Sequence, residues 1–135
     1  MIKIFIDAAT HQSKALSAGG MVLIKDNKQE QIHQPLSAST NNEAEFEMLV
    51  FALTHLRNQS LTNEIIFIYT DSKIVIESLQ KKYAKDPRFS KHLETILELS
   101  SHFPTLFIEW IDEKDNKGAD NLARQSLQKA LKSHS

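Results

Sequence analysis

The sequence contains no cysteine and very little glycine and proline, with three of each among 135 residues. The absence of cysteine excludes disulfide bonds, thiolate metal sites and thiol nucleophiles. No apolar run approaches the roughly 20 residues that a membrane-spanning helix needs. No signal peptide is visible before the first strand pattern. We therefore expect a cytoplasmic protein without membrane association and, because nothing indicates a protein partner, a monomer.

An excess of charge of either sign is also missing, since 16 Lys and Arg against 17 Asp and Glu give a formal net charge of −1. Nucleic-acid-binding proteins usually carry a basic surplus, so the balance is weak evidence against such a partner. A group of acids compensated by a metal would leave the remaining surface mildly basic. The hydrophobic fraction of 41% is typical of a globular protein. The length predicts a single domain over residues 1–135.

The hydrophobic pattern predicts an α/β fold with the element order βββαβααβα. An antiparallel start followed by alternating strands and helices indicates a five-stranded mixed sheet, three strands antiparallel and the rest parallel, flanked by helices. The expected strands are 2–7, 19–24, 29–34, 65–70 and 105–111, and the expected helices are 41–56, 72–83, 88–102 and 119–131.

Four acidic residues lie where a carboxylate is unfavourable unless a cation holds it. Asp7 and Asp71 each end an apolar strand pattern, and Glu45 and Asp120 each open the apolar stripe of a predicted helix. Strand ends and helix starts can meet in the crevice at the carboxyl edge of a sheet. Carboxylates gathered there repel each other and lose hydration, and a hard divalent cation relieves that cost. The pattern therefore predicts a metal-dependent enzyme. Glu43 competes with Glu45 but points away from the stripe.

Four short motifs occur in a fixed order: FIDAAT at 5–10, TNNEAEF at 40–46, YTDSK at 69–73 and GADNLAR at 118–124. Together they closely resemble the type I ribonuclease H family, over residues 2–127. The resemblance implies the ribonuclease H-like fold and an endonuclease that hydrolyses the RNA strand of RNA–DNA hybrids with two Mg²⁺ ions, Mn²⁺ being an alternative. It also implies the metal-binding and catalytic carboxylates, which are the same four acids: Asp7, Glu45, Asp71 and Asp120.

The resemblance places residues 40–46 at a substrate groove, where side-chain amides suit recognition of a 2′-hydroxyl. The predicted substrate-binding residues are Thr40, Asn41, Asn42, Ser72 and Asn116. Capping of the next helix is an equally ordinary use of such polar residues, and for Ser72 we favour it. Trp110 is predicted to lie in the core. His11 is close enough to Asp7 in the sequence to reach the site, although a surface position is commoner.

Two departures from the family pattern, at Ala8 and in the loop 112–118, favour an alternative function, and a third predicts modest affinity for a hybrid. Ala8 stands where the family usually has glycine, and a positive φ there would strain it. The loop 112–118 lacks the histidine of well-known members, and the connection 84–88 is too short for their basic handle. The alternative is a catalytically weak or inactive module that binds hybrid or structured RNA.

A basic cluster is consistent with phosphate contacts or with an ordinary solvated face; it comprises Lys73, Lys81, Lys82, Lys85, Arg88 and Lys91. A 3′–5′ exonuclease is disfavoured because Asp7 does not begin an Asp-x-Glu motif. A phosphoacceptor receiver domain is disfavoured by the early hairpin, because that fold needs a parallel strand order.

Overall fold

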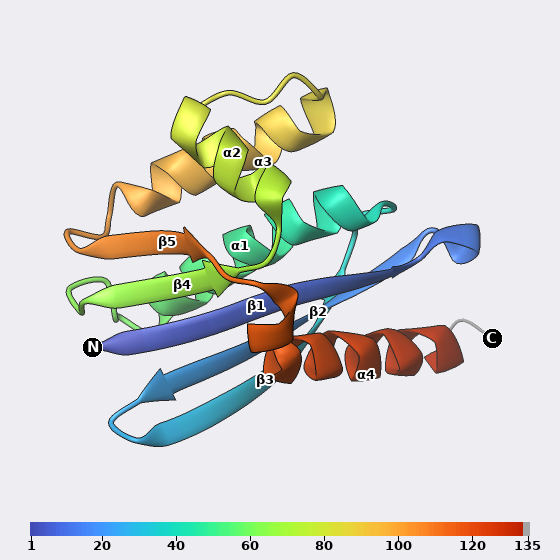
Figure 1. The fold of residues 1–135 in the computed structure, drawn as a ribbon, viewed down its shortest axis with the longest axis horizontal. Coiled ribbons are helices and arrows are strands. Elements are labelled where there is room, and N and C mark those ends of the chain that lie inside the picture. Colours follow the sequence, from blue (N-terminus) through green and yellow to red (C-terminus); the bar gives the residue numbers. More distant parts are fainter. Residues whose placement is uncertain (134–135) are drawn as a thin grey trace.

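The computed structural model describes residues 1–133 and follows the predicted element order (Figure 1). The strands are β1 (Ile2–His11), β2 (Leu16–Lys25), β3 (Lys28–Leu36), β4 (Ile66–Thr70) and β5 (Leu106–Trp110). The helices are α1 (Asn41–Asn58), α2 (Lys73–Lys81), α3 (Pro87–Ser100) and α4 (Lys117–Ser133), with short 3₁₀ turns η1 (Gln12–Lys14) and η2 (Glu113–Asp115). The last two residues of the predicted domain lie outside the described part.

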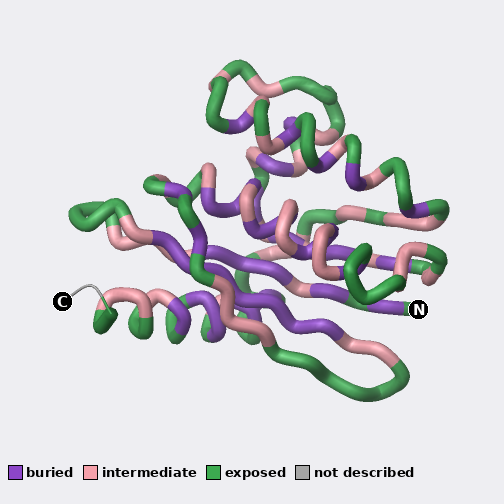
Figure 2. Tube along the Cα trace, turned by 180° about the vertical axis from the view of Figure 1, so that it is seen from behind, coloured by how far each residue is buried: buried purple, intermediate pink, exposed green. Residues whose placement is uncertain are grey.

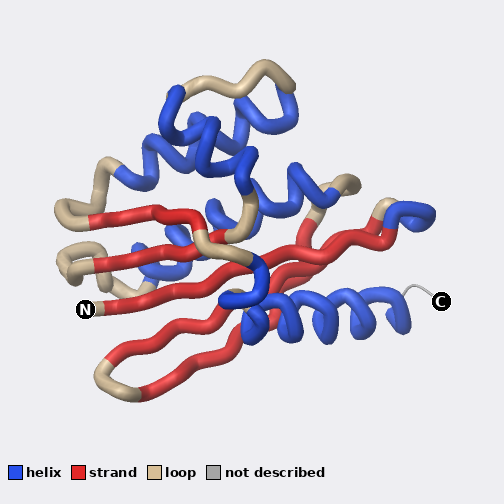
Figure 3. The backbone as a smooth tube through the Cα atoms, in the orientation of Figure 1, coloured by secondary structure: helices blue, strands red, loops and turns tan. Residues whose placement is uncertain are grey.

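The five strands form one mixed sheet in the order β3-β2-β1-β4-β5 (Figure 3). The pairs β1–β2 and β2–β3 are antiparallel, whereas β1–β4 and β4–β5 are parallel. The predicted fold class is therefore confirmed: a ribonuclease H-like α/β fold, three antiparallel strands followed by parallel ones, with flanking helices.

The helices cover both faces of the sheet (Figure 1). One face of β1 carries Ile2, Ile4 and Ile6, all fully buried. Helix α1 packs over this face, and α3 packs against α1. Helix α4 packs on β1, β2 and β3 from the opposite face. Figure 2 shows the consequence, with the central strands buried and the outer helical turns exposed. Burial of this alternating apolar pattern is the main force holding the layers together.

Two adjacent glycines allow the helices to approach β2 from both sides. A side chain at Gly19 would collide with Met48 of α1, and a Cβ at Gly20 would lie 2.5 Å from the carbonyl oxygen of Ala119 in α4. Because successive residues of a strand face opposite sides, each glycine serves one helix. The pair thus sets the spacing of both layers.

Strand β1 differs from its prediction because it continues beyond Asp7 to His11. Its pairing with β4 stops at Phe5, opposite Tyr69, while its pairing with β2 continues to His11, opposite Leu16. Asp7 therefore lies within a strand, at the point where β1 leaves β4. Ala8 is part of the same strand and is not among the described residues with positive φ, so the expected strain at this position is absent.

The prediction for Trp110 was wrong. Its side chain is 43% exposed, since it ends β5 at the edge of the sheet. The indole nitrogen donates to the carbonyl oxygen of Asp71 at 3.2 Å, and Lys73 lies over the ring. Within residues 1–133, no helix combines the length and apolar character needed to cross a membrane.

Candidate metal and catalytic site

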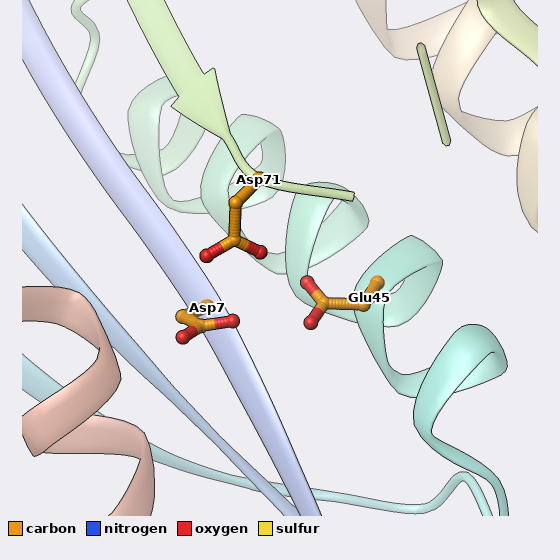
Figure 4. A group of neighbouring side chains, drawn as sticks. All are labelled: Asp7, Glu45 and Asp71. Atoms are coloured by element: carbon orange, nitrogen blue, oxygen red, sulfur yellow. The ribbon is translucent and has the colours of Figure 1, made fainter. Parts of the chain in front are cut away.

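Three carboxylates from separate elements meet at the carboxyl end of β4 (Figure 4). Asp7 comes from β1, Asp71 follows β4, and Glu45 projects from α1. One oxygen of each side chain lies within 4.8 Å of the others. We call these residues the carboxylate triad. Such a group, made of oxygen donors alone, suits a hard cation.

The parallel pairing of β1 and β4 brings the two aspartates to the same level. Phe5 lies opposite Tyr69, and each aspartate comes two residues later. Beyond Thr70 the chain turns into α2, whose first turn is capped by Ser72. Glu45 is held by α1, which begins after Thr40 caps the main-chain N–H of Glu43. The apolar stripe of α1 faces the sheet and takes Glu45 with it.

Burial makes the charged state of the triad unfavourable without a cation. Asp7 is 6% exposed and Glu45 is 4% exposed, and Oε2 of Glu45 is buried with no hydrogen-bond partner among residues 1–133. Loss of hydration, with a smaller contribution from the charge of Asp71, raises the pKa of Asp7 to about 7. Burial, followed by repulsion from Asp7, raises the pKa of Glu45 well above its usual value.

Asp71 is less buried than the other two triad members. Its pKa is raised by burial, and the hydrogen bond from Asn116 opposes that shift. The unpartnered oxygen of Glu45 and the repulsion within the triad are both relieved if a divalent cation binds the three side chains. The triad therefore fits a metal ion on the chemistry of its donors.

Asp120 lies near the triad but is not part of it. A cavity of about 480 Å³ is lined by the triad and by Asp120 at the start of α4. Asp120 accepts a hydrogen bond at 3.0 Å from Arg124, one helical turn later. The side chain of Arg124 is 73% exposed, so this ion pair is easily broken. The fourth predicted acid is thus close to the site and engaged by a cation.

Three basic residues that we did not select from the sequence line the same cavity: Lys114, Lys117 and Arg124. They lower the electrostatic cost of bringing a phosphate close to a group of carboxylates. The spacing of Arg124 from Asp120, one helical turn, was the available signal.

The residues predicted to bind substrate separate into two groups. Asn41 and Asn42 are exposed at the start of α1 and line a smaller cavity beside the triad, together with Ser72. The hydroxyl groups of Thr40 and Ser72 both act as helix caps. Asn116 is only 1% exposed, so the structure gives the predicted substrate contact of this residue no open surface. Its amide points into the protein interior.

The competing acid Glu43 is directed away from the triad. It pairs with His92 of α3 at 3.1 Å. In the basic cluster, Arg88 is paired with Asp86 at 2.7 Å. A second cavity, of about 670 Å³, lies between α2 and α3 and is lined by several members of that cluster, including Lys81 and Lys85.

The chain is similar in sequence to a known protein family and to individual proteins of other organisms. Residues 5–126 match the family described as reverse transcriptase-like. The chain is 40% identical over 129 residues to EbsB of Enterococcus faecalis, covering 96% of each chain. It is 27% identical over 127 residues to ribonuclease HI of Synechocystis sp., covering 82% of this chain and 76% of that protein.

Among solved structures, LC11-RNase H1 in complex with an RNA/DNA hybrid has a TM-score of 0.86 at 23% identity, covering 97% of this chain and 99% of that one. At this identity the likeness is one of fold.

Proposed function

The chain belongs to the type I ribonuclease H family, in its reverse transcriptase-like group, and from that premise we propose that it hydrolyses the RNA strand of RNA–DNA hybrids with divalent metal ions. The observation that carries the proposal is the triad of Asp7, Glu45 and Asp71, whose oxygens lie within 4.8 Å of one another. A buried set of three acids is costly to maintain without a cation. The complete triad therefore supports an active, metal-dependent enzyme.

The triad would hold the metal, with Asp120 as a further ligand if two ions bind. Mg²⁺ suits these donors, and Mn²⁺ is the alternative. A divalent ion in such a site supplies activation of water and stabilisation of charge on the leaving oxygen. Asp120 could serve a second ion through Oδ2, because Arg124 donates to Oδ1, and that exposed ion pair is in any case weak.

The other residues around the triad would position the substrate. Asn41 and Asn42 present exposed amides beside the triad, where they can exchange hydrogen bonds with 2′-hydroxyl groups and so distinguish RNA from DNA. Lys114 and Lys117 line the main cavity and would hold backbone phosphates near the acids. The monomeric and cytoplasmic states remain predictions.

The alternative, an inactive module that only binds hybrid, is less well supported. One reason for that alternative was strain at Ala8, and Ala8 is not among the described residues with positive φ. The other was the missing histidine of the loop 112–118. That loop instead contributes Lys114 and Lys117 to the cavity. A binding module would have no use for a buried triad of acids.

The test is cleavage of a labelled RNA–DNA hybrid with Mg²⁺, with Mn²⁺ and with a chelator, against matched RNA and DNA duplexes. Glu45→Gln should lower kcat at least about a hundredfold, because removal of a ligand exceeds the usual effect of removing its supporting residues. Glu43→Gln is the matched control, since Glu43 lies on the same helical turn but pairs with His92. Metal-independent cleavage, or equal loss in both variants, would refute the proposal. Hybrid binding without cleavage by the wild type would favour the inactive module.

A further inference from the structure

A buried asparagine connects the triad to the start of α4. Asn116 lies between η2 and α4 and is 1% exposed. Its side-chain Nδ2 donates to the carbonyl oxygen of Ile6 at 2.8 Å and to Oδ2 of Asp71 at 3.3 Å. One amide group therefore contacts the strand that carries Asp7 and the side chain of Asp71.

The orientation of this amide is fixed by its partners. The carbonyl oxygen of Ile6 can only accept a hydrogen bond, so the NH₂ group must face it. The opposite atom, Oδ1, is buried without a hydrogen-bond partner in the described structure. Burying an unpaired carbonyl oxygen is unfavourable, so the contacts of the NH₂ group must offset that cost.

Helix capping does not explain the residue. The main chain of Asn116 starts α4, because its carbonyl oxygen accepts from the N–H of Asp120 at 3.1 Å. A capping side chain acts through its oxygen, which accepts from the N–H groups of the first turn. Here the side-chain oxygen has no partner in the described part of the chain, and the nitrogen makes both contacts. The side chain is thus used for Ile6 and Asp71 and not for the helix.

We propose that Asn116 is a positioning residue that holds the Asp71 carboxylate against β1 and keeps one of its oxygens directed at the metal. The proposal rests on the proposed function for its metal and names a role for a residue that does not touch substrate. The neutral amide offers two donors at this point, one for a main-chain carbonyl and one for a carboxylate. Because Asp120 lies one turn further along α4, the same residue also anchors the helix that carries the fourth acid.

Substitutions that cap equally well separate the two roles. Asp and Ser cap helices about as well as Asn, so a capping role predicts that Asn116→Asp and Asn116→Ser behave like the wild type. The positioning role predicts otherwise. Aspartate has no N–H for Ile6 and adds a negative charge beside Asp71, so Asn116→Asp should be less stable than Asn116→Ala at pH 8 without metal. Serine can donate only one hydrogen bond, so Asn116→Ser should restore only part of what Asn116→Ala loses.

The decisive measurements are metal binding and the separation of kcat from KM. Calorimetric titration with Mn²⁺ should show affinity about tenfold weaker in Asn116→Ala and weakened in Asn116→Ser, the size expected when a residue that orients a metal ligand is removed. Cleavage should lose kcat with little change in KM for the hybrid, because Asn116 is buried. Asp86→Ala is the control: Asp86 caps α3 and does not line the cavity of the triad, so its loss should lower stability and leave Mn²⁺ affinity unchanged.

The stability measurements keep this test separate from that of the proposed function. Unfolding of wild type, Asn116→Ala, Asp71→Ala and the double variant gives a cycle that needs neither metal nor activity. Effects that are not additive would support the link between the two side chains even if the wild type bound no metal, which would refute only the proposed function. Additive effects in this cycle would overturn the positioning role. It would also be overturned if Asn116→Asp and Asn116→Ser kept the stability and the Mn²⁺ affinity of the wild type.

Discussion

At the scale of single residues, the four predicted acids have different environments. Asp7 and Glu45 are buried, Asp71 is half-buried, and Asp120 is partly exposed and paired with Arg124. All three carboxyl groups of the triad therefore have raised pKa values, because burial and repulsion between neighbouring acids act on them together. This pattern has consequences for stability that are separate from catalysis.

Without metal, the protein should lose stability as the pH rises from 4 to 7. Folding raises the pKa of Asp7 from 3.8 to about 7, so the folded state binds the proton more tightly than the unfolded chain. That advantage is fully present below pH 3.8 and is lost as the pH passes through 7. Asp7→Asn removes the titration, and the variant should be more stable than the wild type by about 2 to 4 kcal/mol at pH 8.

The measurement is urea unfolding followed by circular dichroism in a chelator at several pH values. A parallel pH dependence in Asp7→Asn and the wild type would contradict the assignment of the slope to this residue.

His11 should take no part in the reaction. It lies four residues beyond Asp7 along the extended β1, a span of about 13 Å, and its ring contacts Ser13. The loop 112–118 offers no imidazole either. We therefore expect His11→Ala to leave the pH–rate profile on an RNA–DNA hybrid unchanged. An inflection near pH 6.5 that disappears in His11→Ala would show that this histidine acts at the site.

At the scale of elements, the sequence predicted the order and type of strands and helices, because most of them carry a clear hydrophobic period. It did not predict how far β1 extends, because residues 8–11 are not an apolar run and are strand only through pairing with β2. Trp110 was misplaced because its strand pattern does not reveal that β5 is an edge strand. The buried role of Asn116 depends on contacts across 110 positions, which no local pattern reports.

The spacing of β2 and α4 yields a prediction from two glycines. A Cβ at Gly20 would meet main-chain atoms of α4 at 2.5 Å, and a backbone cannot yield as a flexible side chain does. Gly20→Ala should therefore destabilise the fold by about 1 to 3 kcal/mol. Gly118 would meet only Val22 at 3.5 Å, an ordinary contact, and it lies in the first turn of α4. Gly118→Ala should be neutral or stabilising by up to about 1 kcal/mol.

Chemical denaturation of the two variants checks this difference, with Gly118→Ala as the matched control for Gly20→Ala. Equal stability of both variants would mean that α4 is free to move away from β2. In that case the close approach would not constrain the layer, and the placement of Asp120 relative to the triad would be adjustable.

At the scale of the whole molecule, the metal site is a property of the tertiary fold. The triad draws its three side chains from β1, α1 and the end of β4, which are brought together only when the sheet and α1 are packed. The unfolded chain offers the same acids widely separated and fully hydrated. A divalent ion should therefore bind the native state far better than the unfolded one, and such selective binding stabilises the native state.

Mg²⁺ or Mn²⁺ at a hundredfold excess over Kd should add about 2.7 kcal/mol to the free energy of unfolding, which corresponds to a rise in Tm of roughly 5 to 15 °C. Asp7→Asn should lose most of this rise, although it is the more stable protein without metal, because the substitution removes both the repulsion and a ligand. The stability advantage of Asp7→Asn over the wild type should therefore shrink or reverse as metal is added. Glu43→Gln should follow the wild type throughout. Thermal unfolding across a metal titration measures all three proteins, and an equal rise in Asp7→Asn would place the bound ion outside the triad.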